Sequence, residues 1–382
     1  MGRLLCLNLR NCDIVEGNRT VSYGRDVFVK GGRFGDPASR AEVRDYSTEL
    51  SGLNVLPGMI DCQVNGAGGV LFEDICDEAA LLSFDRCLAK RGTTRWCGTF
   101  ISAPENKIDR VLKVVEHCAQ PTGLIGFHFD GPWLNPKYRG YHPIERLASS
   151  SPAHIGLIER ASQIGKALVT LAPEVISEYD LTRLRRISNI RICVGRSDAS
   201  AALIGDVIGT SLCALTNTAN WMPSISAETA GPFGAMMRTK ECWSSLICDG
   251  EHICRDTFAI IKRATYCEKA FIVSNQMSDD MAPFQSLSIG SETIVVDGKV
   301  FRTVDRELAG GTLSMIECIK VAVSQFSVPE DEAIRMGTEY PAQFLGVPDK
   351  HGMIALGRHA DMVVADNQFD VRAVFRDGER LV

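Results

Sequence analysis

Residues 124–136 read Leu-Ile-Gly-Phe-His-Phe-Asp-Gly-Pro-Trp-Leu-Asn-Pro, and this stretch decides the expected fold. The apolar run Leu124–Phe129 is typical of a short buried strand, and the Gly-Pro pair that follows ends it. Asp130 therefore lies at the carboxyl end of a strand, where α/β barrels carry their chemistry. His142 lies on the next loop, close enough to face the same end. The stretch predicts a carboxylate of the metal-ligand type beside an acid or base.

Seven similar apolar runs precede and follow this strand, and amphipathic segments such as Ala79–Lys90 and Ile108–His117 separate them. Strands that alternate with helices indicate a parallel sheet, and eight of them predict an α/β protein with a (β/α)8 barrel, the TIM barrel. Two more helices are expected, at Ser314–Phe326 and Pro329–Gly337. The expected strands are Val55–Val64, Arg95–Ser102, Leu124–Phe129, Ala167–Leu171, Ile190–Val194, Ser211–Thr216, Ser244–Cys248 and Ala270–Ser274.

The two ends of the chain follow a different pattern. Apolar and polar residues alternate there between turns rich in Gly, Asn and Asp, for example in Ala360–Asp366. This alternation predicts short antiparallel strands with one buried face. We expect both ends to form one small β-sandwich around an inserted barrel. The predicted domains are residues 1–55 and 346–382 for the sandwich and residues 56–345 for the barrel.

The composition predicts a protein with a large core and no affinity for nucleic acid. The 382 residues are 45% hydrophobic, with a net charge of −6 and a pI of about 5.7. No apolar run has the length of a membrane span, and the N-terminus lacks a long signal-type segment. Fourteen cysteines form no C-x-x-C pair, which favours buried thiols in a reducing compartment. We expect a cytoplasmic protein with no membrane partner.

Eight motifs, in order along the chain, resemble those of N-acetylglucosamine-6-phosphate deacetylases, which belong to the amidohydrolase superfamily. Each motif is short, but the ordered set covers nearly the whole chain. The resemblance implies a (β/α)8 barrel with a small β-sandwich built from both termini, and a homodimer. The motifs are Leu56–Gly66, His128–Pro136, Val169–Glu174, Gly195–Ala199, Asn220–Pro223, Asp249–His252, Leu308–Leu313 and Gly357–Val364.

The resemblance also implies a divalent metal held by a Glu and two His at strand ends, with an Asp after the eighth strand as general base. At these four positions the chain carries Asp130, Arg196, Asn217 and Asn275. A guanidinium is permanently charged and has no lone pair, and an amide cannot take a proton from water. We expect Arg196 to fill the vacated space and to pair with Asp130. We therefore expect no metal cofactor.

Other positions of the family persist. His252 corresponds to a histidine that contacts the substrate, and His142 to a loop residue that faces its acyl group. Asp130, His142 and His252 are the candidate catalytic residues, although Asp130 could be only half of a salt bridge and His142 only an exposed loop histidine. Glu228 stands where the family carries a phosphate-binding Arg, and a carboxylate repels a phosphate dianion. The candidate substrate-binding residues are Gln63, Asn65, Arg196, Asn217, Asn220, Glu228, Asn275 and Leu308.

Three functions follow as hypotheses. The first is a metal-independent enzyme that performs acid–base chemistry on a non-phosphorylated small molecule, through a condensation, cyclisation, isomerisation or elimination. The second is a catalytically inactive member that acts as a binding or regulatory protein. The third is residual metal-dependent deacetylation of an amino sugar at a shifted metal site. We favour the first, because a polar pocket is retained while the metal and phosphate ligands are replaced together.

Overall fold

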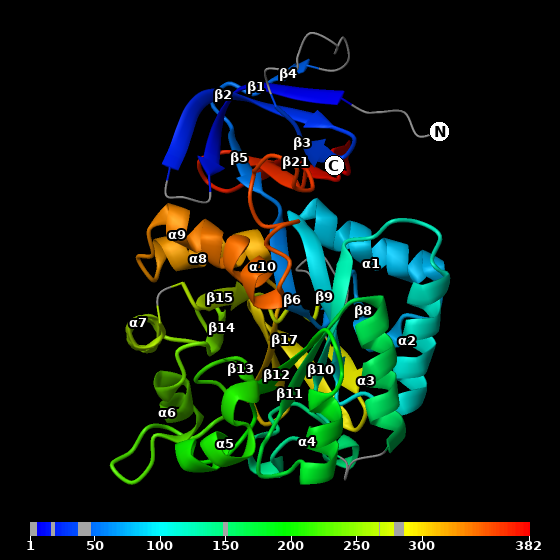
Figure 1. Cartoon of the computed structure of the whole chain (residues 1–382), viewed down its shortest axis with the longest axis vertical. Helices are drawn as coiled ribbons and strands as arrows, with labels where there is room; N and C mark the ends of the chain where they lie inside the picture. The colour runs from blue at the N-terminus through cyan, green and yellow to red at the C-terminus, as the bar shows by residue number, and fades with distance from the viewer. Residues whose placement is uncertain (1–5, 17–19, 37–46, 148–151, 267, 279–285) are drawn as a thin grey trace. The chain divides into compact units, whose positions relative to one another are not determined.

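The computed structural model describes residues 6–16, 20–36, 47–147, 152–266, 268–278 and 286–382 (Figure 1). The chain divides into two compact units. One comprises Met1–Asp61, Arg86–Arg95 and Ser314–Val382, and the other comprises Cys62–Asp85 and Trp96–Leu313. Compactness does not establish independent folding, so the domain boundaries at residues 55/56 and 345/346 stay a prediction.

The predicted (β/α)8 barrel is confirmed. Eight strands form one sheet in sequence order, and the pairs from β9 to β15 are parallel. A parallel bridge between Val64 and Gln276 joins the first strand to the segment after the last, which closes the sheet. The strands are β6 (Met59–Val64), β9 (Thr93–Ile101), β10 (Leu124–Asp130), β11 (Lys166–Leu171), β12 (Ile190–Val194), β13 (Leu212–Leu215), β14 (Trp243–Ile247) and β15 (Ala270–Val273).

Helices follow the strands in the alternation that the sequence predicts, and α2, α3 and α5 lie outside the strands in Figure 1. Ser314 and Glu317 form a capping box that starts α8. The helices are α1 (Glu78–Lys90), α2 (Glu105–His117), α3 (Pro152–Ile164), α4 (Glu178–Arg185), α5 (Ala201–Val207), α6 (Gly231–Arg238), α7 (Arg255–Ala264), α8 (Met315–Ser324), α9 (Glu330–Met336) and α10 (Glu339–Leu345). Single 3-10 turns are η2 (Phe72–Asp74), η3 (Pro136–Tyr138), η4 (Ile144–Arg146) and η5 (Gly209–Ser211).

The expected first strand, Val55–Val64, is in fact two strands that belong to different sheets. Its first part, β5 (Asn54–Pro57), pairs with β20 (Met362–Ala365) near the C-terminus, and its second part is β6. Gly58 separates them at a close approach, since a Cβ at this position would lie 2.2 Å from Oγ1 of Thr94. The apolar run is continuous, so its pattern alone does not reveal the change of sheet.

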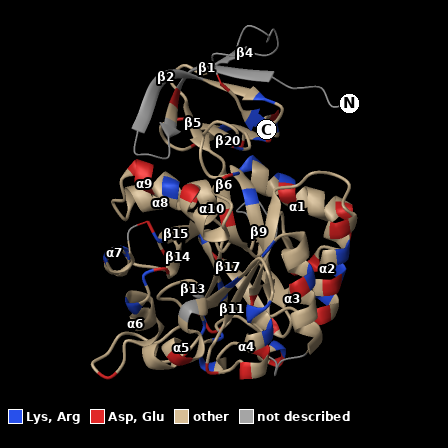
Figure 2. Ribbon diagram, viewed as in Figure 1, with Lys and Arg blue, Asp and Glu red and all other residues tan. Residues whose placement is uncertain are grey.

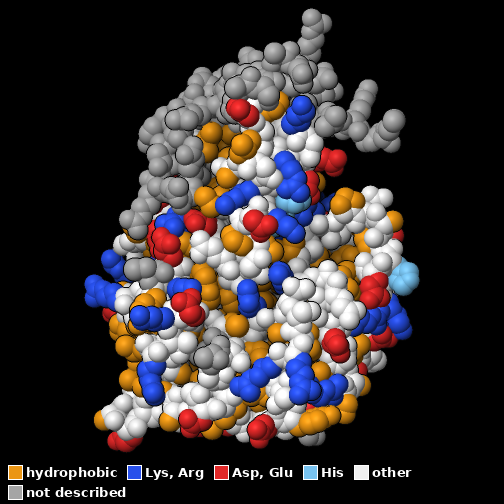
Figure 3. All heavy atoms as spheres, viewed as in Figure 1, with side chains coloured by type: hydrophobic (Ala, Val, Ile, Leu, Met, Phe, Trp, Pro, Cys, Tyr) orange, Lys and Arg blue, Asp and Glu red, His pale blue; other side chains and the backbone are white. Residues whose placement is uncertain are grey.

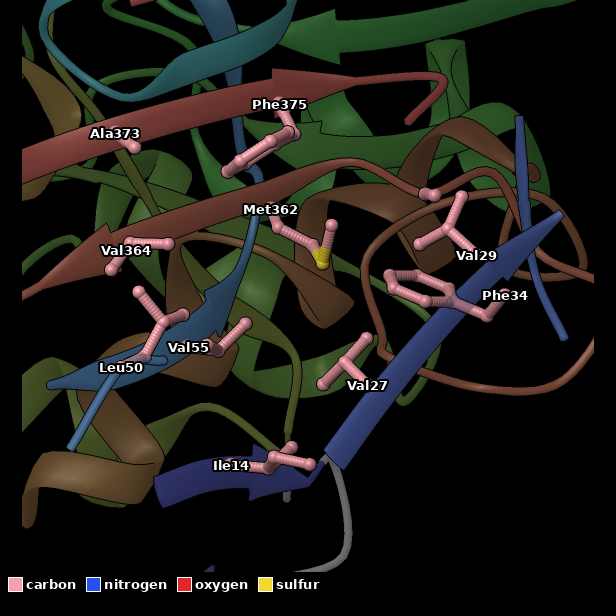
Figure 4. Packing of buried hydrophobic residues seen from close by; sticks show 11 residues of the cluster. Ile14, Val27, Val29, Phe34, Leu50, Val55, Met362, Val364, Ala373 and Phe375 are labelled. Atoms are coloured by element: carbon pink, nitrogen blue, oxygen red, sulfur yellow. The ribbon is translucent and has the colours of Figure 1, made fainter. Parts of the chain in front are cut away.

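Both ends of the chain contribute to one separate β-sheet, as the sequence predicts. Its strand order is β22-β21-β20-β5-β1-β2-β3, with β4 paired to β1. Side chains from both ends meet in one hydrophobic core, which includes Ile14, Val29, Val55, Met362 and Phe375 (Figure 4). The strands not yet given are β1 (Cys6–Glu16), β2 (Thr20–Lys30), β3 (Arg33–Phe34), β4 (Ser47–Glu49), β21 (Val371–Arg376) and β22 (Glu379–Arg380).

A four-stranded antiparallel sheet follows the last barrel strand, and our sequence analysis did not predict it. It consists of β16 (Ser286–Ile289), β17 (Glu292–Asp297), β18 (Val300–Thr303) and β19 (Leu308–Gly311). The pair Asp297-Gly298 is a typical hairpin signal, and Gly298-Lys299 form the turn between β17 and β18, so the sequence did contain a clue. A further two-stranded pair, β7 (Gly66–Ala67) and β8 (Val70–Leu71), follows β6.

Charges of both signs are mixed along the helices. Lys113 and Arg160 both pair with Asp109, and Arg160 also pairs with Glu116, which links α2 to α3. Figure 2 shows Lys and Arg interspersed with Asp and Glu along α2. Figure 3 shows the same mixture on one face of the molecule. Among the described helices, none has the combination of length and apolar character that a membrane crossing requires.

An aromatic cluster under β9 makes one glycine indispensable. Phe72 packs against Phe84, Trp96, Phe100 and Phe127 at ring-centre distances of 5.2 to 6.2 Å. A Cβ at Gly98 would lie 2.3 Å from the Phe72 ring. We predict that Gly98→Ala lowers the free energy of unfolding by about 1–3 kcal/mol, because the core is overpacked. Urea unfolding followed by fluorescence measures the change.

Gly156→Ala is the matched control for this prediction. Gly156 lies inside α3, and a Cβ there would meet no atom within 4 Å. The control should be unchanged or stabilised by about 0.5–1 kcal/mol, since Ala costs less entropy than Gly in a helix. Equal stability of Gly98→Ala and the native protein would contradict the predicted packing.

Candidate active site

Polar residues gather where the barrel strands end. The carboxyl ends of parallel strands share one rim of a barrel, so residues far apart in the sequence meet there. The side chains at this rim are almost completely buried, and the most exposed of those named here, Asn220, is 9% exposed. They are Gln63 and Asn65 after β6, Ser102 after β9, Asp130 in β10, Arg196 after β12, Asn217 and Asn220 after β13, Asp249 and His252 after β14, and Asn275 after β15.

The expected ion pair between Arg196 and Asp130 is confirmed. Nε of Arg196 lies 3.3 Å from Oδ1 and 3.2 Å from Oδ2 of Asp130, and both side chains are buried. Burial alone would raise the pKa of the Asp130 carboxyl. The charge of Arg196, with help from His142, instead holds that pKa well below its ordinary value. Asp130 is therefore ionised, and its charge is balanced inside the protein.

His142 is fully buried, so the alternative of an exposed loop histidine is wrong. Its Nε2 lies 3.2 Å from Oδ2 of Asp130, and its Nδ1 lies 2.8 Å from the hydroxyl of Ser102. Burial, together with the charge of Arg196, lowers the pKa of His142 to about 4, so the ring is neutral at pH 7. Because an ionised carboxylate can only accept, Nε2 carries the proton and Nδ1 accepts from Ser102. Both ring nitrogens are thus engaged.

Two aromatic rings hold the guanidinium of Arg196. Its central carbon lies 4.7 Å from the ring centre of Tyr141 and 4.1 Å from that of Trp221. Nη1 donates to the carbonyl oxygen of Arg139 at 2.8 Å. Cation–π contacts of this kind stabilise a guanidinium that has left water. The contact between Trp221 and Arg196 depends on the fold, because the two residues follow different strands.

Asn275 is the centre of an amide network. Its Oδ1 accepts hydrogen bonds from Gln63 at 3.0 Å, from Asn65 at 2.8 Å and from the hydroxyl of Tyr141 at 3.4 Å. Its Nδ2 donates to the carbonyl oxygen of Ala309 in β19 at 3.1 Å. The amide is therefore bound on both sides, and a carboxylate here would face the Ala309 carbonyl. The antiparallel sheet β16–β19 helps to fix this residue.

Only one ring nitrogen of His252 has a hydrogen-bond partner. Its Nδ1 lies 2.5 Å from Oδ2 of Asp249, whose Oδ1 accepts from the backbone amides of Glu251 and His252. Burial would raise the pKa of Asp249, but these hydrogen bonds hold it below its ordinary value. Nδ1 therefore carries a proton, and Nε2 is buried without a hydrogen-bond partner. This arrangement leaves a lone pair on Nε2 when the ring is neutral.

The remaining predicted residues either lie outside the buried cluster or have a side-chain atom without a hydrogen-bond partner. Asn217 and Asn220 each have one buried amide atom without a partner. Leu308 begins β19 and is half-buried next to Ala309. Glu228 is exposed on the loop before α6, and its carboxylate accepts from the hydroxyl of Ser226. The structure therefore does not bring Glu228 into the buried cluster.

Sequence reasoning missed three residues of the site. Tyr141 directly precedes His142, Ser102 follows a strand, and Asp249 precedes His252 by three residues. The strand-end position of Ser102 and the Asp-x-x-His spacing were available signals. The direction of the Tyr141 ring was not, because it depends on packing against Trp221.

Several residues at this rim have a left-handed backbone although they are not glycines. The φ angles are 50° for Arg196 and Asn217, 52° for Trp221, 49° for Asn275 and 42° for Ser102. Each such residue costs about 1 kcal/mol or more, and these conformations concentrate at functional sites. The strain supports a functional role for the rim.

Comparison with known proteins agrees with this architecture. Residues 260–381 match the model of the Amidohydrolase family. The match covers less than half of the chain, and it indicates that the barrel with its polar rim is similar to those of amidohydrolases.

The chain is 30% identical over 346 residues to the N-acetylgalactosamine-6-phosphate deacetylase of a Shewanella species, covering 87% of this chain and 84% of the other. It is 26% identical over 397 residues to human N-acetylglucosamine-6-phosphate deacetylase, covering 98% of this chain and 95% of the human one. The crystal structure of N-acetylglucosamine-6-phosphate deacetylase from Pasteurella multocida superimposes with a TM-score of 0.90 at 27% identity, over 98% and 99% of the two chains. The chain belongs to the N-acetylglucosamine-6-phosphate deacetylase family.

The residues at the family's metal position do not fit a divalent metal. Three ligands with lone pairs are needed beside an open position. The part of the chain that the structure describes contains no group of three or more His, Cys, Asp or Glu side chains that could hold an ion. Asp130 is the one carboxylate at the position, and Arg196 and His142 already occupy its oxygens.

Replacing Arg196 with Met would leave Asp130 buried without a cation. We predict a loss of about 3–5 kcal/mol of folding free energy at pH 7. In the native protein the low pKa of Asp130 stabilises the fold above about pH 4, and this stability is lost as the pH falls. In the variant, burial raises the pKa, so stability is lost as the pH rises. The penalty therefore grows from pH 4 to pH 7, and urea unfolding at several pH values measures it.

Lys137→Met serves as the control for Arg196→Met. It removes an exposed ion pair of Lys137 with Asp198, at 3.1 Å, and should change stability little at any pH. A penalty for Arg196→Met that is the same at pH 4 and pH 7 would contradict a charged Asp130.

Proposed function

We propose that this deacetylase-like amidohydrolase works without the family's metal and performs acid–base chemistry on a non-phosphorylated small molecule. His252 is the general base in this proposal. The observation that carries it is the one-sided histidine, with Nδ1 held by Asp249 at 2.5 Å and Nε2 buried and unpaired. A base needs an oriented ring, a free lone pair and a group that stabilises its protonated form.

The chemistry follows from these contacts. Nε2 of His252 takes a proton from the substrate, and the ionised Asp249 stabilises the imidazolium that results. The proton then returns from Nε2 to the product or the leaving group. Condensation, cyclisation, isomerisation and elimination all contain such a step. Asp249 is a positioning residue, because it acts through His252.

Asp130 and His142 have a different role in this proposal. Both oxygens of Asp130 accept hydrogen bonds from Arg196 or His142, and both ring nitrogens of His142 are engaged. They hold a permanent cation, Arg196, where the family places its metal. We propose that they orient Arg196, while Gln63, Asn65, Asn217, Asn220 and Asn275 shape the polar wall around the substrate.

A specific observation favours a second function, that of an inactive binding or regulatory protein. Asp130, His142 and Tyr141 are 0% exposed, as residues of a structural core are. His142 is hydrogen-bonded to Asp130, and Tyr141 to Asn275. Drift from an active deacetylase would also produce this closed network. The one-sided His252 favours the enzyme.

The proposal also covers the substrate, the cellular location and the oligomeric state. By the family resemblance, Glu228 stands at the phosphate-binding position, and this supports a non-phosphorylated substrate. The structure leaves Glu228 exposed outside the buried cluster, so the buried cluster itself gives no evidence on this point. We also propose a cytoplasmic homodimer with no nucleic-acid or membrane partner, by analogy with the family and from the acidic composition.

Activity in the presence of a chelator tests the proposal. We predict that turnover in a panel of non-phosphorylated N-acyl amino sugars and related metabolites is unchanged by EDTA. His252→Ala should lower kcat by about 10²–10⁴-fold, the usual contribution of a general base. His117→Ala, at the exposed end of α2, is the control and should keep full activity.

Metal analysis of the purified protein separates the alternatives. Near-stoichiometric zinc or iron, with activity lost in EDTA, would revive metal-dependent deacetylation. Ligand binding without turnover across the panel would favour the binding protein.

A further inference from the structure

The guanidinium of Arg196 has one nitrogen without a hydrogen-bond partner. Nε binds Asp130 and Nη1 binds the carbonyl of Arg139, whereas Nη2 is buried and unpaired. Arg196 is 2% exposed, so bulk water does not reach this nitrogen freely. A buried charged donor without an acceptor is costly. Nη2 therefore marks a position where an acceptor atom belongs.

The surroundings fix the direction of this donor. Tyr141 and Trp221 pack against the guanidinium, and Gly140 lies close to both Trp221 and Arg196. A Cβ at Gly140 would lie 2.5 Å from Nε1 of Trp221 and 2.8 Å from Nη1 of Arg196. The orientation of the Nη2 N–H groups is thus fixed before a ligand binds.

Other unpaired polar atoms lie at the same rim. Trp221 contacts both Arg196 and His252, with a ring-centre distance of 5.8 Å to the latter. The set contains donors and acceptors, as a polar ligand with both kinds of group requires. Besides Nη2 of Arg196 it consists of Oδ1 of Asn65, Oδ1 of Asn217, Nδ2 of Asn220 and Nε2 of His252.

Charge decides which acceptor fits. The positive charge of Arg196 is already balanced by the carboxylate of Asp130, and His142 is neutral. A bound anion would leave this buried site with a net negative charge beside Asp249. An uncharged acceptor oxygen adds no charge to the buried site, and it needs only the hydrogen bond from Nη2.

We propose that Nη2 of Arg196 donates a hydrogen bond to the carbonyl oxygen of an uncharged small-molecule substrate, so that Arg196 selects carbonyl compounds. The chemical consequence rests on the proposed function. When His252 takes a proton from the carbon beside the carbonyl, the electron pair of the C–H bond moves toward the oxygen, where the Nη2 donor of Arg196 stabilises it. The imidazolium of His252 forms at the same time, so the net charge of the site does not change. The proton stays on Nε2 until it returns to the product.

An NMR titration tests the proposal without any turnover. The probes are acetamide, a minimal uncharged carbonyl compound, and acetate, its anion of the same shape. The protein carries ¹⁵N-labelled arginine, and the signal that is lost in Arg196→Lys identifies Arg196. We expect acetamide to shift this signal saturably, and acetate to bind at least ten-fold more weakly.

Two variants sharpen the test. Arg196→Lys keeps the positive charge but removes the planar guanidinium and its Nη2 donor, and it should lose acetamide binding. Gly140→Ala keeps Arg196 but displaces its guanidinium, and should weaken binding at least ten-fold, which decides the matter even if Arg196→Lys does not fold. Gly156→Ala in α3 is the control and should bind acetamide as the native protein does.

Three outcomes would overturn the proposal: acetate binding as tightly as acetamide, full acetamide binding by folded Arg196→Lys, or no saturable shift of the Arg196 signal. The last would mean that Nη2 serves a water molecule. Acetamide binding without any turnover would instead support this site and count against the proposed enzyme function, so the two failures are distinguishable.

Discussion

The rim of this barrel depends on the buried ion pair between Arg196 and Asp130. Two charges removed from water are stable only if each finds further partners. Here His142 and Ser102 complete the carboxylate side, and the Arg139 carbonyl and two aromatic rings complete the guanidinium side. The pair and its partners come from different strand ends, so it holds the rim together much as a metal and its ligands would.

The scaffold of the family is kept, and we propose that its chemistry is changed at a few side chains. The fold superimposes on a deacetylase with a TM-score of 0.90 at 27% identity, whereas the described residues contain no group of three or more His, Cys, Asp or Glu that could hold an ion. Function resides in the site and not in the fold, so such replacement needs no change in the strands. Asn275 illustrates this, since its amide is fixed by three side chains and by the β19 backbone.

Not every polar group at the rim is satisfied in this way. The Asp130 network is complete on its carboxylate side, whereas Arg196 Nη2 and His252 Nε2 have no hydrogen-bond partner, and both side chains contact the ring of Trp221. These unpaired atoms support the proposed ligand site, because an unpaired buried donor or acceptor costs stability unless a ligand or water meets it. The combination of a closed network and open atoms is what a rigid binding site requires.

The sequence by itself determined the barrel, the separate terminal sheet and the meeting of Arg196 with Asp130. The barrel and the terminal sheet follow from local periodicity. The meeting of Arg196 with Asp130 follows from the family resemblance, which puts both residues at the family's metal position. Only the tertiary structure decided that Val55–Val64 divides between two sheets, that His142 is buried, that Glu228 stays in solvent, and that Tyr141 and Asp249 belong to the site. The hairpin signal Asp297-Gly298 was readable, but its effect on Asn275 was not. The physical reason is that burial and side-chain direction depend on contacts between residues far apart in the chain, which no local pattern encodes.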